Sequence, residues 1–181
     1  MSNPGIKNFS LKFIDIMIGI VLGLGFQWWP ELKEPWQHLA FIFAYISIID
    51  YWIDYSPMLR KYPPHHELEL MIDMGILFSL FLFIYGAHLS LIYFLSAFIL
   101  SRVLDILWLW RIKREFVLGS DNRFTNTWIC FDMVEILASA ILIFLSFKNS
   151  YSSLTVLIIF IAMRLVTRIA ASFIYRKAHF T

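Results

Sequence analysis

This sequence has little cysteine and little charge. It contains one cysteine, Cys130, so no disulfide can form within the chain and no second thiol can complete a zinc or redox pair. Charged residues make up 15% of the chain, and the formal net charge of +2 is too small to favour nucleic-acid binding. The motifs of phosphate-binding loops, serine nucleophiles, zinc proteases and haem proteins are also missing. We therefore expect no enzymatic activity, no cofactor, no bound metal and no nucleic-acid partner.

Apolar residues, by contrast, make up 60% of the 181 residues, which indicates a protein of the lipid bilayer. A helix needs about 20 residues to cross roughly 30 Å of hydrocarbon. Six segments qualify, so the sequence predicts an all-α polytopic membrane protein, a single domain over residues 1–181 folded as three hairpins. The predicted spans are 11–29, 36–56, 68–87, 89–111, 127–147 and 153–175.

The basic residues predict the orientation of these spans. Ten of them fall on one side of the predicted bundle, and Lys33 and Lys148 fall on the other. Because cytoplasmic loops are enriched in lysine and arginine, we expect both termini to be cytoplasmic and the three hairpins to point outward. The ten residues are Lys7, Lys12, Arg60, Lys61, Arg111, Lys113, Arg114, Arg123, Arg176 and Lys177.

Aspartates recur near the start of the odd-numbered spans, in the segments FIDIM, MIDMG and CFDMV. Asp15, Asp73 and Asp132 are 58 and 59 residues apart. Hairpins of equal length would give this spacing by themselves, and the helix dipole favours acids in the first turn of a helix. Two interpretations stay open: first-turn acids without a further role, or a threefold repeat that became a working site.

Charged pairs lie deeper inside the even-numbered spans. The members of each pair are three or four residues apart and share one helix face, as Arg102 and Asp105 do. Because a charge facing lipid costs at least about 2.5 kcal/mol, we expect these side chains to face the bundle interior. These charges either only hold the helices in register or form a gate or ion-coupling site. Because carboxylates outnumber arginines among them, a pore at this level would favour cations over anions. The predicted intramembrane network is Asp73, Asp132, Glu135, Arg102, Asp105, Arg164 and Arg168.

A histidine-containing segment, 63–73, leads into the third span. His66 and Glu69 share a helix face there, with Asp73 one turn further on, which would suit a divalent metal. Prolines before a helix and acids in its first turn are also ordinary features of a helix start. We favour this second interpretation.

The first span carries small residues on one face. Gly19 and Gly23 are four residues apart, a spacing that lets helices approach closely. In a symmetric oligomer, the stripe on this side of the helix could line a pore whose apolar constriction gates by dewetting. In a monomer the same stripe would be a helix-packing face. The predicted pore-lining stripe is Ile16, Ile20, Gly23 and Gln27.

The start of this span also resembles a protein family. Phe13-Ile14-Asp15, with Ile20 five residues after the aspartate, is similar to the Phe-Ser-Asp motif of the six-span potassium channels of lysosomes and their bacterial and archaeal relatives. Ile14 stands at the family's serine and Phe9 at its arginine. The segment AYISIIDYWIDYSPMLRKY resembles the family's second span, and LWLWRIKRE the end of its fourth. The resemblance implies a tetramer with first helices around the pore, Ile20 as an apolar gate and potassium as the permeant ion, in the plasma membrane of a prokaryote.

The sequence thus predicts a subunit of a homo-oligomeric cation channel, with Phe13 and Asp15 at the inner mouth of its pore-lining first helix. Two other functions stay open. A monomeric six-helix substrate-binding or transport subunit would have a sealed internal cavity near the charged network. A structural membrane protein would use its charges only to specify packing.

Overall fold

The protein is helical throughout the part that its computed structural model describes, residues 4–119, 121–148 and 151–179, with side chains placed between 12 and 174. No strand occurs among these residues, so the predicted all-α class is confirmed. A short 3-10 helix, Phe26–Glu31 (η1), extends the first α-helix. The α-helices are α1 (Pro4–Gly25), α2 (Pro35–Lys61), α3 (Glu67–Leu89), α4 (Leu91–Glu115), α5 (Asp121–Phe147) and α6 (Ser153–His179).

Among the described residues, six helices are long and apolar enough to cross a membrane, as the sequence predicted. They contain 22 to 27 residues each, which corresponds to roughly 33 to 40 Å at about 1.5 Å per residue. These are the dimensions of an integral multi-pass membrane protein. The helices continue past the predicted spans, α2 to Lys61 and α5 back to Asp121, because charged helix ends fit the polar layer outside the hydrocarbon.

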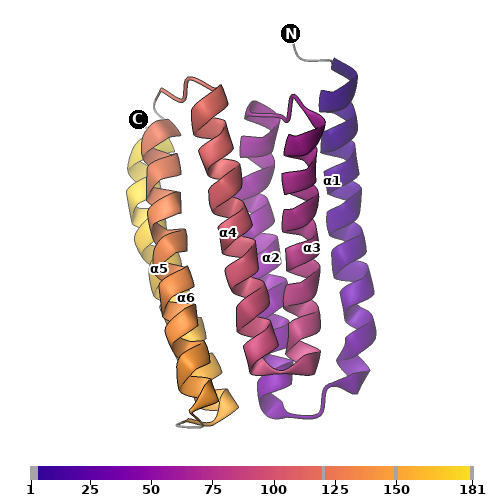
Figure 1. The fold of residues 1–181 in the computed structure, drawn as a ribbon, viewed down its shortest axis with the longest axis vertical. Helices are drawn as coiled ribbons and strands as arrows, with labels where there is room; N and C mark the ends of the chain where they lie inside the picture. Colours follow the sequence, from indigo (N-terminus) through magenta and orange to yellow (C-terminus); the bar gives the residue numbers. More distant parts are fainter. Residues whose placement is uncertain (1–3, 120, 149–150, 180–181) are drawn as a thin grey trace.

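Five of the helices surround a common interior, and α1 lies outside it. Figure 1 shows the six helices side by side, with α1 beginning and α6 ending at the same end of the bundle. Contacts run from α2 to α3, then through α4 and α5 to α6, which returns to α2. We call these five helices the α2–α6 ring. Because α1 packs mainly against α3, one long side of α1 has no neighbouring helix among the described residues of the chain.

The turn between α3 and α4 is tight because Gly86 has no side chain. A Cβ added at Gly86 would lie 2.7 Å from the Cα of Phe94 and 2.8 Å from its backbone nitrogen. Ser90 is the only residue between the two helices; its N–H donates to the Gly86 carbonyl at 3.2 Å, and its hydroxyl accepts from the N–H of Tyr93 at 3.4 Å. This turn fixes α3 against α4 along their length.

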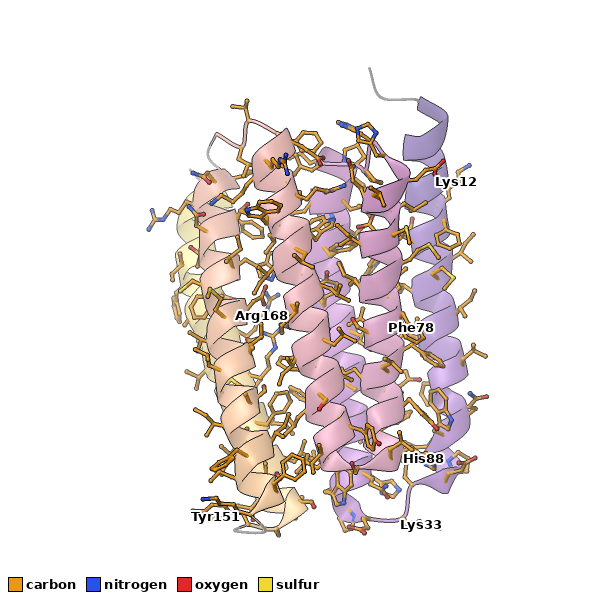
Figure 2. The ribbon with its side chains drawn as sticks, viewed as in Figure 1. Lys12, Lys33, Phe78, His88, Tyr151 and Arg168 are labelled. Atoms are coloured by element: carbon orange, nitrogen blue, oxygen red, sulfur yellow. The ribbon has the colours of Figure 1, made fainter. Side chains whose placement is uncertain are left out.

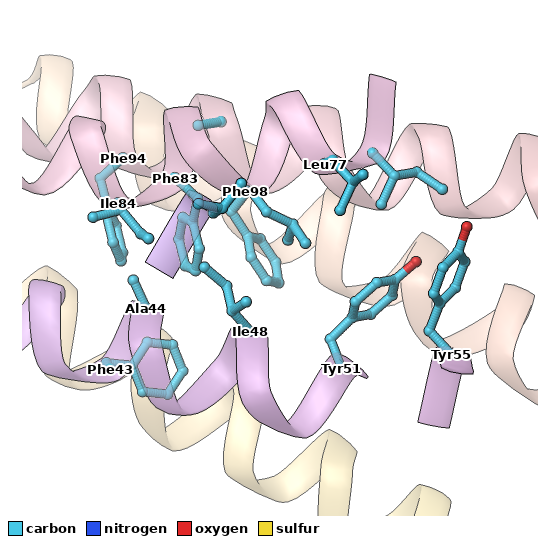
Figure 3. Packing of buried hydrophobic residues seen from close by; sticks show 14 of the residues in the cluster. Phe43, Ala44, Ile48, Tyr51, Tyr55, Leu77, Phe83, Ile84, Phe94 and Phe98 are labelled. Atoms are coloured by element: carbon cyan, nitrogen blue, oxygen red, sulfur yellow. The ribbon is translucent and has the colours of Figure 1, made fainter. Parts of the chain in front are cut away.

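The ring interior is aromatic in the half nearest the α3–α4 turn. The Phe83 and Phe94 rings stack with their centroids 4.4 Å apart, and Phe98 meets Phe160 edge-on at 4.9 Å. Such ring pairs contribute about 0.5–1.5 kcal/mol beyond the area that they bury. Figure 3 labels four of these rings, with Phe43 of α2 on the side of the interior opposite Phe83, Phe94 and Phe98. Phe43 also meets Phe160 edge-on, with the ring centroids 5.6 Å apart. We call these five phenylalanines the aromatic plug.

Candidate functional site

The predicted stripe on the first span points away from the rest of the chain. Ile16 and Ile20 keep 63% and 42% of their surface exposed, and Gly23 and Gln27 are exposed as well. A Cβ added at Gly23 would have no neighbour within 4 Å. The structure therefore leaves all four residues uncovered, but it divides the predicted stripe: Ile16, Ile20 and Gly23 lie on one side of α1, whereas Gln27 lies in η1, beyond the end of that helix. The opposite, buried side consists of Ile14, Ile18 and Val21.

The segment that resembles the channel motif lies at the end of the bundle where the chain termini are. Phe13 is partly buried against the core, and Ile14 is completely buried. Asp15 is half exposed, and its Oδ2 lies 3.9 Å from Nη2 of Arg60, which is itself largely exposed. An ion pair so open to solvent contributes little to stability.

The three recurring aspartates have different surroundings. Asp15 is half exposed, whereas Asp73 and Asp132 are buried. Because α5 begins at Asp121, Asp132 lies eleven residues inside its helix, beyond the first turn on which the helix dipole acts. Asp15 and Asp73 also lie beyond the first turns of their helices, which begin at Pro4 and Glu67. The interpretation of the three aspartates as first-turn acids is therefore wrong.

Arg102 is the centre of a group of buried charges inside the α2–α6 ring. Its side chain extends from α4 and is almost completely buried. Its Nη1 lies 3.2 Å from Oδ1 of Asp132 and 3.7 Å from Oδ2 of Asp105. Its Nε lies 3.7 Å from Oε2 of Glu135. Three carboxylates thus share this guanidinium.

Glu135 has a second cation. Nη1 of Arg164, on α6, donates to Oε1 of Glu135 at 2.5 Å, and the Thr167 hydroxyl donates to the same oxygen at 2.6 Å. The structure therefore brings together five of the seven residues predicted for the network, from α4, α5 and α6. We call these five the charge cluster: Arg102, Asp105, Asp132, Glu135 and Arg164.

The other two predicted network members, Arg168 and Asp73, lie outside the charge cluster and have other partners. Arg168 contacts Asp50 at 2.8 Å and also pairs with Asp54, both on α2. Figure 2 shows Arg168 at a level between the two ends of the bundle, which Lys12 and Lys33 mark; its side chain is partly exposed. Arg168 lies one helical turn beyond the arginine that binds Glu135, at a level where α2 supplies the facing carboxylates.

Two of the buried aspartates accept hydrogen bonds from tyrosines, and the sequence patterns did not identify these tyrosines. Tyr51 donates to Oδ1 of Asp105 at 3.0 Å, and Tyr55 donates to Oδ1 of Asp73 at 2.6 Å. Figure 3 shows both tyrosine hydroxyls directed away from the α2 backbone. A buried carboxyl needs a donor, so two tyrosines four residues apart in an apolar span were the available signal.

Glu69 is engaged by Arg111, which the sequence patterns had assigned only to the basic end of a span. Nη1 of Arg111 donates to Oε2 of Glu69 at 2.9 Å, and the His65 backbone N–H donates to the same oxygen at 2.5 Å. In the described ranges, no group of three histidine, cysteine or acidic side chains is placed to hold a metal.

A cavity of about 20 Å³ borders the charge cluster, between α2, α5 and α6. Such a volume accommodates about one water molecule. It is far below the several hundred Å³ that a small-molecule site occupies. The charged and hydroxyl-bearing residues in its lining are Asp50, Tyr51, Asp54, Asp132, Glu135, Arg164, Thr167 and Arg168.

Polar contacts connect the end of α2 to the start of α5. The Tyr62 hydroxyl donates to Oδ2 of Asp121 at 2.7 Å, and Nζ of Lys61 approaches the same oxygen at 2.5 Å. Burial and the hydrogen bond to Asp121 raise the pKa of Tyr62. Its phenol therefore remains a donor across the physiological pH range.

The geometry offers two candidate sites of different kinds, the uncovered stripe on α1 and the charge cluster inside the ring. No protein-family model, no curated protein and no solved structure matches this chain.

Proposed function

We propose that this chain is a subunit of a homo-oligomeric cation channel, with α1 lining the pore. The observation that carries the proposal is the uncovered stripe on α1, a helix that packs at the edge of its own subunit. Around a symmetry axis, copies of Ile20 would form an apolar ring that stays dry until it widens. Gly23, open in the subunit, would let neighbouring first helices approach closely.

The interior of the subunit favours a pore between subunits over a path within one. The aromatic plug fills the half of the ring nearest the α3–α4 turn. The cavity beside the charge cluster has room for about one water. An ion would have to displace packed phenylalanines to cross the subunit. The same small cavity is a poor fit to a monomeric substrate-binding subunit.

The proposal includes the orientation and the ion. We place both termini in the cytoplasm and the three hairpins outward, because the basic residues concentrate at that end; Figure 2 shows Lys12 and Lys33 at opposite ends. Potassium and a tetramer are proposed from the resemblance of the first helix to lysosomal-type potassium channels. The plasma membrane of a prokaryote is proposed on the same ground.

The test combines the mass of the purified protein with ion flux. Light scattering, with the detergent contribution subtracted, should give the mass of a tetramer. In liposomes loaded with potassium, Ile20→Asn should increase the leak, because a polar ring wets the constriction. Ile141→Asn is the matched control, an exposed isoleucine on α5 that should leave the flux unchanged. A monomeric mass, or equal flux from the Ile20→Asn oligomer and the wild type, would contradict the proposal.

A further inference from the structure

The charge cluster contains more negative than positive groups, whatever the oligomeric state of the protein. Three carboxylates, Asp105, Asp132 and Glu135, face two guanidiniums, those of Arg102 and Arg164. The three acids are almost completely buried. With every group ionised, the cluster would hold one uncompensated negative charge inside a membrane helix bundle, where such a charge is strongly unfavourable.

The excess charge lies on Asp105 and Asp132. Glu135 has its own cation in Arg164, which leaves Arg102 to the two aspartates. Both approach the same nitrogen, Nη1 of Arg102, so the two carboxyl groups are neighbours. In each of them Oδ2 is buried and accepts no hydrogen bond from the described part of the chain.

We propose that Asp105 and Asp132 together bind one proton, which exchanges with water through the adjacent cavity. One proton leaves one negative charge for Arg102 and so balances the cluster. It also turns one of the two unpartnered carboxyl oxygens into a donor. A metal ion fits less well, because the guanidinium of Arg102 already occupies the position between the carboxylates.

The cavity provides the route for exchange. Asp132 borders it on the buried side, and the partly exposed Asp50 and Asp54 border it on the other. One water molecule in this space would link Asp132 to the outside. Several groups face Asp132 from the helices around it: Arg102 and Asp105 on α4, Arg164, Thr167 and Arg168 on α6, Tyr51, Asp50 and Asp54 on α2, and Glu135 on α5 itself.

A buried hydroxyl lies one helical turn along α5 from the charge cluster. Ser139 is completely buried, and its Oγ has no hydrogen-bond partner among the described residues. It follows Asp132 and Glu135 on the same face of α5, at seven- and four-residue spacing. Buried hydroxyls are nearly always satisfied by protein or by ordered water. An ordered water would satisfy the Ser139 hydroxyl in the same way.

Infrared spectroscopy of the purified protein at neutral pH tests the proposal directly. A protonated carboxylic acid has a C=O stretch that is separate from the bands of carboxylates and amides. The wild type should show this band, and labelling the aspartate side-chain carboxyl with carbon-13 should shift it. Asp105→Asn and Asp132→Asn should each remove one component of the band. Asp73→Asn, a buried aspartate outside the cluster, should leave that component in place.

The outcomes distinguish a shared proton from a bound metal ion. Absence of the band from the wild type would overturn the proposal without any variant, as would a band identical in Asp105→Asn, Asp132→Asn and the wild type. Absence of the band together with sodium-dependent stability would assign the cluster to a metal ion instead. Ala171→Val narrows the cavity. In deuterated water it should therefore slow the shift of the aspartate C=O band, which reports exchange of the bound proton for deuterium. An unchanged exchange rate would overturn the route through the cavity.

Discussion

At the scale of the residue, Arg102 is the side chain on which the buried charges depend most. Replacing it with methionine keeps most of the volume but leaves Asp105 and Asp132 without a cation. Removing one partner of a buried ion pair typically costs about 3–5 kcal/mol. We expect Arg102→Met to lower the free energy of unfolding in detergent by an amount in this range. Arg60→Met, which removes an exposed arginine 3.9 Å from Asp15, should change it by less than about 0.5 kcal/mol.

A double variant shows whether electrostatics causes this loss. Asp132→Asn removes one of the carboxylates that Arg102 neutralises while keeping the shape of the side chain. In the Arg102→Met background, it should therefore restore part of the lost stability, and the two changes should not be additive. If the double variant were no more stable than Arg102→Met alone, the loss would come from packing, and the electrostatic account of Arg102 would be wrong.

At the scale of the element, the α3–α4 hairpin depends on Gly86. A Cβ there would meet the backbone of Phe94 at 2.7 Å, which cannot move without separating the helices. We expect Gly86→Ala to destabilise the protein by about 1–3 kcal/mol, as overpacking does. Gly75→Ala on the same helix is the control, because its Cβ would meet only the Leu104 side chain, at 3.5 Å. It should be neutral or stabilising by up to about 1 kcal/mol, since alanine favours helix. Equal thermal stability of the two variants would contradict this account.

The helices were predictable from the sequence, but the partners of their charged side chains were not. Hydropathy identifies apolar segments long enough to cross a bilayer, because a lone helix satisfies its own backbone in lipid. Spacing also placed Arg164 and Arg168 on one face of α6. It could not show that Arg164 meets Glu135 on α5 while Arg168 meets Asp50 on α2, because that depends on α6 packing between those two helices. Local spacing alone predicted the stripe of Ile16, Ile20, Gly23 and Gln27, and its role in lining a pore stays a prediction.

At the scale of the whole molecule, α1 connects the subunit to the proposed oligomer, and two of its glycines separate folding from assembly. A Cβ at Gly23 would have no neighbour within 4 Å in the subunit, whereas one at Gly25 would lie 2.5 Å from the Tyr45 hydroxyl and 3.0 Å from Ile84. Gly25→Leu should therefore lower the thermal stability of the subunit, partly by displacing Tyr45 from the Leu22 carbonyl to which it donates at 2.6 Å.

Gly23→Leu should have the opposite pattern of effects. The side chain has room in the subunit, and leucine favours helix over glycine, so helix content and subunit stability should be kept. In the oligomer it would hold neighbouring first helices apart, because close helix approach in membranes needs small residues. Light scattering should then give a smaller mass than that of the wild type. If Gly23→Leu kept the wild-type mass, this side of α1 would face lipid, and a central pore lined by first helices would be wrong.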